Sequence, residues 1–152
     1  MSLLAGTELV LVAQVPKAGD RWHQVHFNID VASRFLRVTP GGDLMVSLER
    51  VDWAGRVVAR SARPLVFAER NRNCKVEFDF GGVVDYPSGG PPLLVVLELD
   101  ARQFRYQSLL PGSSGYDEML RLTNDLPSVG RGKRRAITTL DEVRLRWPAC
   151  PL

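Results

Sequence analysis

Cysteine and histidine are scarce in this chain, with two of each among 152 residues. Cys74 and Cys150 form no C-x-x-C pair, so neither a disulfide framework nor a cysteine-based zinc site is expected. His23 and His26 lie in a segment with strand-like alternation, which places their rings on opposite faces and argues against a shared metal site. We therefore expect no bound metal and no cofactor.

Long hydrophobic runs are missing too, since none reaches the roughly 18–20 residues that cross a membrane. The apolar segment 1–15 has no basic start and is interrupted by Glu8, so a signal peptide is not expected. We expect a chain with no membrane association, located in the cytoplasm. The apolar fraction of 45% is typical of globular proteins, and the length suits a single domain over residues 1–152.

Lysine is nearly absent, because Lys17, Lys75 and Lys133 are the only lysines among 20 basic residues. Two explanations for the excess of arginine stay open. The planar guanidinium suits phosphates and guanine edges, whereas a GC-rich coding sequence would enrich arginine without any function. The formal net charge of +3 is too small to indicate a polyanionic partner by itself.

The motifs of common enzyme classes are incomplete or missing. The segment 130–134 lacks both the earlier glycine and the following Ser or Thr of a phosphate-binding loop, and no E-x-K nuclease motif occurs. Glu77 and Asp79 share one face of a predicted strand, with Asp85 in the next loop. Such a group holds a divalent cation only if another acid joins it, and a solvated strand face is the simpler interpretation. No catalytic residue is assigned.

Seven segments carry strand patterns. In residues 23–29, Val25, Phe27 and Ile29 point to one face and polar residues to the other, a period of two. A bulge is expected near Pro64 in the long fourth strand. Residues 81–92 are rich in glycine and proline and predict an irregular loop. The predicted strands span residues 8–15, 23–29, 44–48, 56–67, 75–80, 93–99 and 103–109.

Helix signals concentrate near the C-terminus. Ser114-x-x-Asp117 predicts a capping box, and Thr138 and Thr139 before Asp141 and Glu142 predict a second helix start. A short helix over 30–35 is also expected, whereas 125–136 reads as a polar, basic connector. The fold class is therefore mainly β (α+β): about seven strands in an antiparallel barrel or sandwich, with two helices toward the C-terminus.

Two basic groupings stand out. Residues 131–135 hold four positive charges beside glycines, an arrangement that can follow a phosphate backbone. Residues 69–75 place arginines and asparagines, the side chains suited to guanine and adenine edges, in a turn between two strands. The candidate nucleic-acid-binding residues are Arg70, Asn71, Arg72, Asn73, Lys75, Arg131, Lys133, Arg134 and Arg135. The prediction requires the two groupings to share one end of the fold.

These observations favour a non-catalytic nucleic-acid-binding module, with DNA as the expected ligand, over an enzyme. Small β-barrel domains with basic loops occur as DNA-reading modules in defence proteins, although no motif here supports that analogy residue by residue. A protein–protein interaction or assembly domain that uses Trp53 and the 81–92 loop is the first alternative. A metal-dependent hydrolase that uses Glu77, Asp79 and Asp85 is the second. The oligomeric state is not predicted.

Overall fold

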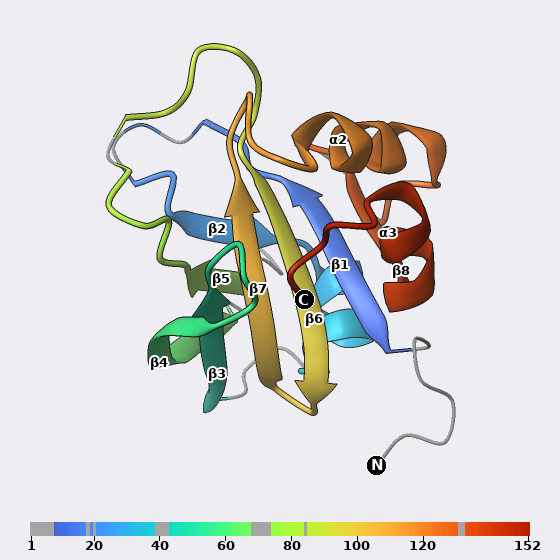
Figure 1. Ribbon diagram of the computed structural model, residues 1–152. Helices are drawn as coiled ribbons and strands as arrows, with labels where there is room; N and C mark the ends of the chain where they lie inside the picture. Colours follow the sequence, from blue (N-terminus) through green and yellow to red (C-terminus); the bar gives the residue numbers. More distant parts are fainter. Residues whose placement is uncertain are drawn as a thin grey trace.

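Eight strands form one sheet in the computed structural model, in the order β2-β5-β4-β3-β7-β6-β1-β8 (Figure 1). The structure describes residues 8–17, 19, 21–38, 43–67, 74–83, 85–130 and 133–152, with the backbone alone for 43, 66 and 67. The strands are β1 (Leu9–Gln14), β2 (Gln24–Phe27), β3 (Asp43–Val51), β4 (Val57–Phe67), β5 (Cys74–Glu77), β6 (Leu93–Asp100), β7 (Gln103–Leu109) and β8 (Arg135–Thr139).

The mainly β class is confirmed, but two features of the predicted sheet are wrong. β3 and β7 run parallel, so the sheet is mixed rather than antiparallel. The sheet is also not closed as a barrel, because β2 and β8 lie at opposite ends of the strand order. The seven predicted strands are present, and β8 is an eighth strand that begins at the end of the predicted 125–136 connector and runs to the predicted helix start. The register irregularity of the β3–β4 pair falls at Arg50 and Val51, not near Pro64.

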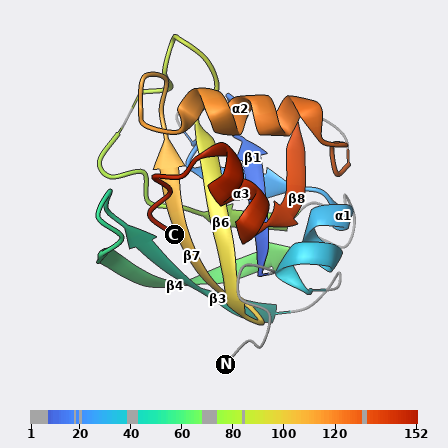
Figure 2. The ribbon, with the colours of Figure 1, turned by 45° about the vertical axis from the view of Figure 1, so that its right-hand side comes forward.

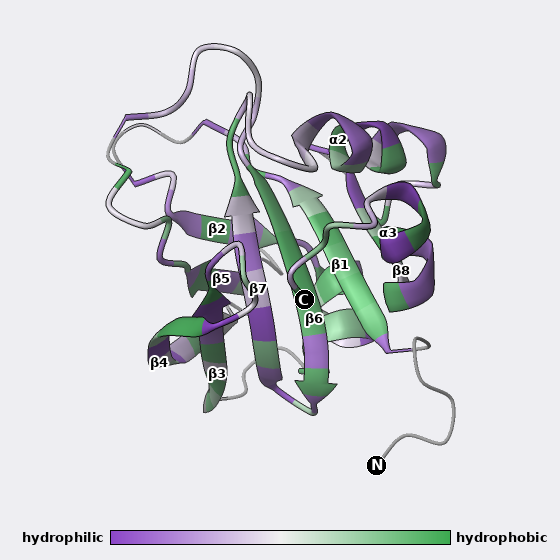
Figure 3. Cartoon of the chain, in the orientation of Figure 1, coloured by the Kyte–Doolittle hydropathy of each residue, from purple (hydrophilic) through white to green (hydrophobic). Residues whose placement is uncertain are grey.

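β1 and β6 are the most hydrophobic strands (Figure 3) because both of their faces are covered. One face packs into the main core, to which β1 contributes Leu11 and Ala13 and β6 contributes Leu94 and Val96. The opposite face packs against the C-terminal helices through residues such as Val12. The sheet therefore separates two apolar clusters, one inside its curve and one beneath the helices.

A short helical segment closes part of the main core. It consists of α1 (Ile29–Val31) and the π-helical turn η1 (Ala32–Leu36). Asn28 begins it, since its Oδ1 accepts a hydrogen bond from the Val31 amide over 3.1 Å. Phe35 stacks on Phe104 of β7, with ring centroids 5.2 Å apart. The short helix predicted over 30–35 is thus confirmed, and its cap is Asn28.

Two helices, α2 (Tyr116–Asp125) and α3 (Leu140–Arg146), lie over β1, β6 and β8 (Figure 2). Thr139 caps α3 as predicted, because its Oγ1 accepts from the Glu142 amide. The capping box predicted at Ser114 is wrong: Gly115 begins α2, and the Ser114 hydroxyl instead accepts a hydrogen bond from the Trp147 indole. Among the described residues, no helix has both the length and the apolar character needed to cross a membrane.

Candidate nucleic-acid interface

The structure places four of the nine candidate residues. Lys75 lies in β5, Lys133 and Arg134 directly precede β8, and Arg135 is the first residue of β8. The other five candidates, Arg70, Asn71, Arg72, Asn73 and Arg131, lie outside the described residues. The four placed residues have four different environments, so the two basic groupings are not uniform charged loops.

Lys75 lies on the outer face of the β2–β5 pair. It is the register partner of His26, whose side chain is exposed on the neighbouring strand. A hollow of about 250 Å³ lies beside it, and Gln24, Arg63 and Glu77 form part of its wall. Glu77 pairs with Arg63 at 3.6 Å, whereas Lys75 makes no ion pair with any described carboxylate. Lys75 is therefore a basic group available to a ligand on this face.

Lys133 is exposed and also has no described carboxylate partner. Its backbone carbonyl accepts a hydrogen bond from Arg135 over 3.0 Å, which fixes the chain just beyond the side chain. The ammonium group thus projects from a fixed backbone position. Among the described members of the 131–135 grouping, Lys133 is the one presented to solvent.

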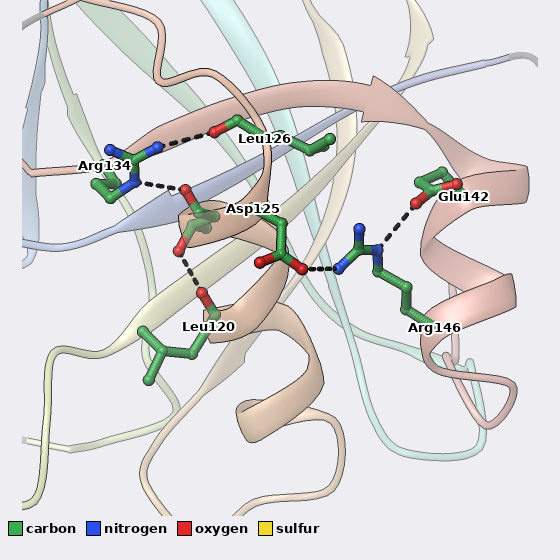
Figure 4. Close-up of polar contacts among 7 residues, drawn as sticks. Leu120, Asp125, Leu126, Arg134, Glu142 and Arg146 are labelled. Atoms are coloured by element: carbon green, nitrogen blue, oxygen red, sulfur yellow. Dashed lines mark hydrogen bonds and ion pairs between the residues drawn. The ribbon is translucent and has the colours of Figure 1, made fainter.

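The Arg134 side chain binds the C-terminal end of α2 (Figure 4). Its Nε donates to the Thr123 carbonyl over 2.6 Å, and its Nη2 donates to the Leu126 carbonyl over 2.8 Å. Carbonyls at a helix C-terminus lack helical partners and carry partial negative charge, so a guanidinium satisfies them well. Arg146 of α3 reaches the same end of α2 through Asp125, over 2.8 Å. Arg134 therefore holds β8 to α2.

Arg135 is buried, with 4% of its surface exposed. Its Nη2 donates to the His26 carbonyl on β2 over 2.7 Å, and its guanidinium lies 5.3 Å from the centre of the Phe27 ring. Burial lowers the pKa of Arg135 to about 10. A guanidinium held in this way is not exposed to a phosphate backbone, which separates Arg135 from the role assigned to it by sequence.

The residues that border both basic groupings meet at the end of β2. Cys74, which follows residues 70–73 in the chain, is the register partner of Phe27. Gly130, which precedes Arg131, lies so close to Asn28 that a Cβ there would overlap the asparagine side chain. Arg135 reaches the carbonyl of His26. β2 is therefore the element that Cys74, Gly130 and Arg135 share, which its sequence alone does not indicate.

The acidic residues considered for a metal site are separated by arginines. Glu77 pairs with Arg63, and Asp79 pairs with Arg50 at 3.5 Å. Asp79 also accepts a hydrogen bond from the Gly81 amide, which uses one carboxylate oxygen in a turn. No group of three His, Cys, Asp or Glu side chains within the described ranges could hold a metal ion. The hydrolase hypothesis gains no support from this part of the chain.

The surface considered for a protein partner forms a second hollow, of about 400 Å³. Trp53 is 51% exposed at its edge, and Phe80 and Gly81 link it to the start of the 81–92 loop. The Trp53 indole meets that of Trp147 edge to face, with centroids 6.4 Å apart. The tryptophan is thus anchored on one side and open on the other.

Comparison with known proteins gives one informative likeness. No family model and no curated protein matches the chain. Among solved structures, the N-terminal domain of Helicobacter pylori LlaJI.R1 has a similar fold, with a TM-score of 0.55 and 9% sequence identity. The match covers 86% of this chain and 97% of that one. At this level of identity the likeness concerns the fold alone.

Proposed function

We propose that this chain is a non-catalytic DNA-binding module that serves as an accessory or specificity domain of a defence-type system. The observation that supports the proposal is that Cys74, Gly130 and Arg135, which border or belong to the two basic groupings, all contact the end of β2. Lys75 and Lys133 would contact phosphates, and the arginines and asparagines of residues 70–73 would supply base recognition. The neighbouring fold is itself an N-terminal domain, that of LlaJI.R1, which is compatible with an accessory role.

The local charges favour a polyanion at this surface. Lys75 and Lys133 are not neutralised by described carboxylates, whereas Arg63, Arg105 and Arg146 each have acidic partners. A phosphate that replaces solvent at an unpaired ammonium releases condensed counterions, which provides sequence-independent affinity. Base recognition would then come from Asn71 and Asn73, since asparagine pairs with adenine edges.

Replacing Lys75 or Lys133 with alanine is expected to weaken DNA binding and to make the binding less dependent on salt. Each substitution removes one phosphate contact and should flatten the slope of log K against log salt by about 0.9. Fluorescence anisotropy with a short labelled duplex, titrated between about 50 and 200 mM salt, measures both quantities.

The matched control is Arg121→Ala, because Arg121 is an exposed basic residue on α2 and takes part in none of the contacts described at β2. Its slope and affinity should equal those of the wild type. Binding by the wild type that does not change with salt, or no binding to duplex DNA, single strands or RNA, would refute the proposal.

A protein-interaction domain is the second candidate, and a specific observation favours it. Trp53 exposes half of its surface beside a hollow, whereas large aromatic residues are usually buried. Exposed tryptophans beside pockets are typical anchors of protein interfaces. This surface does not include β2, so one chain can carry both interfaces.

A further inference from the structure

The sheet leaves a gap between its two edge strands, β2 and β8, which we call the seam. These strands occupy the two ends of the strand order, and no backbone ladder joins them within the described residues. An uncovered edge exposes unpaired backbone groups, and buried carbonyls require partners. In this protein side chains provide those partners, and Arg135 is the principal one.

Arg135 bonds to both sides of the seam. Nη2 donates to the His26 carbonyl of β2, and Nη1 donates to the Lys133 carbonyl just before β8. Its Nε is buried without a hydrogen-bond partner among the described residues, and no described carboxylate pairs with the guanidinium. A buried charge without a counterion opposes folding, so stability alone is a weak reason for an arginine here.

The base of the basic loop is fixed at the same place. The Val129 amide donates to the Arg135 carbonyl over 2.7 Å, which forms a stem between the chain just before Gly130 and the first residue of β8. The Asn28 amide group donates to the Val129 carbonyl over 3.3 Å and so ties the stem to β2. Gly130 packs against Asn28 without room for a Cβ. The described residues on both sides of 131–132 are therefore anchored to the end of β2.

We infer that Arg135 is a positioning residue, which anchors the Lys133 backbone to β2 so that Lys133 and Lys75 face one ligand, and that it does not contact phosphate. This inference rests on the proposed function. The physical reason is preorganisation. A backbone that is already fixed at Lys133 loses less conformational entropy when DNA binds. Arg135 then acts on affinity through geometry, and the number of phosphate contacts stays the same.

Two substitutions separate positioning from phosphate contact. Arg135→Lys keeps the positive charge but loses the planar guanidinium that reaches two carbonyls. Arg135→Met loses both the charge and the guanidinium. Positioning predicts that each variant binds duplex DNA about tenfold more weakly with an unchanged salt slope. A direct phosphate contact predicts near-normal binding by Arg135→Lys and a slope flatter by about 0.9 in Arg135→Met, which would overturn the inference. Wild-type affinity in both variants would also overturn it.

A measurement without DNA tests the anchor by itself. Hydrogen exchange of the Val129 amide should accelerate in Arg135→Lys, while the Val12 amide at the centre of the sheet stays protected. If the arginine variants do not fold, Gly130→Ala displaces Asn28 from the same stem and should reduce affinity with the slope unchanged. Unaltered Val129 exchange would refute the anchor. Wild-type protein that binds no nucleic acid would refute the proposed function, even where Val129 exchange responds as expected.

Discussion

Alanine in place of Gly115 is expected to lower the free energy of unfolding by about 4 kcal/mol and Tm by roughly 10 °C. Gly115 begins α2 with a φ of 82°, and an added Cβ would overlap the indole of Trp147. Trp147 is 3% exposed and packs in the apolar cluster beneath the helices, so it has little room to move. Backbone strain contributes about 1 kcal/mol and overpacking about 3 kcal/mol.

Gly112→Ala is the matched control for this prediction. Gly112 has a φ of 90°, but no atom lies within 4 Å of the position that its Cβ would take. It should therefore lose only the strain contribution of about 1 kcal/mol. Thermal unfolding followed by circular dichroism measures both variants. Equal losses at the two glycines would show that Trp147 does not pack on Gly115.

Alkaline pH is expected to destabilise the fold by roughly 4 kcal/mol between about pH 8 and pH 11. Burial raises the pKa of the Cys74 thiol from 9.0 to about 12 and that of the Tyr106 phenol from 10.0 to about 12. Below about pH 9 both groups are protonated in the folded and in the unfolded chain, so their full contribution to the free energy of unfolding is present. Above it the unfolded chain loses protons that the folded chain keeps, at about 1.4 kcal/mol per pH unit for each group.

Urea unfolding at a series of pH values gives this dependence, and Cys74→Ala separates the two groups. The variant should lose the Cys74 part of the decline that begins near pH 9, with the remainder from Cys150, whose pKa burial also raises. It should keep the decline that begins near pH 10, where Tyr106 starts to ionise in the unfolded chain. A stability that is flat from about pH 9 to pH 11 in the wild type would contradict the burial of both groups.

Local patterns predicted most of the strands, because alternation and turn residues are properties of short segments. They missed β8, which is short and whose first residue, Arg135, ends a run of basic residues that suggested a connector. Ala136 and Ile137 pair with Val12 and Leu11, a contact between the two ends of the chain. The parallel β3–β7 pairing and the open sheet also depend on long-range contacts, so no local pattern indicated them.

The candidate site was predicted from its basic residues alone, and the structure gives these residues different roles. Four bases in six residues resemble a solvated loop, yet Arg134 binds α2 and Arg135 is buried in the seam. One signal was present: Arg135 shares a strand face with Ile137, which packs against the main core. Recognising it required knowing that a strand begins at Arg135. The contacts of Cys74, Gly130 and Arg135 with the end of β2 are tertiary contacts, so no local sequence pattern indicated them.

The most direct test of the central claim is a footprint of bound DNA on the folded protein. Amide exchange of the wild type, measured with and without a short duplex, should slow at His26, Lys75 and Lys133 and stay unchanged at Trp53 and along α2. Protection confined to Trp53 and the 81–92 loop, or no protection at saturating DNA, would show that β2 does not carry the nucleic-acid interface.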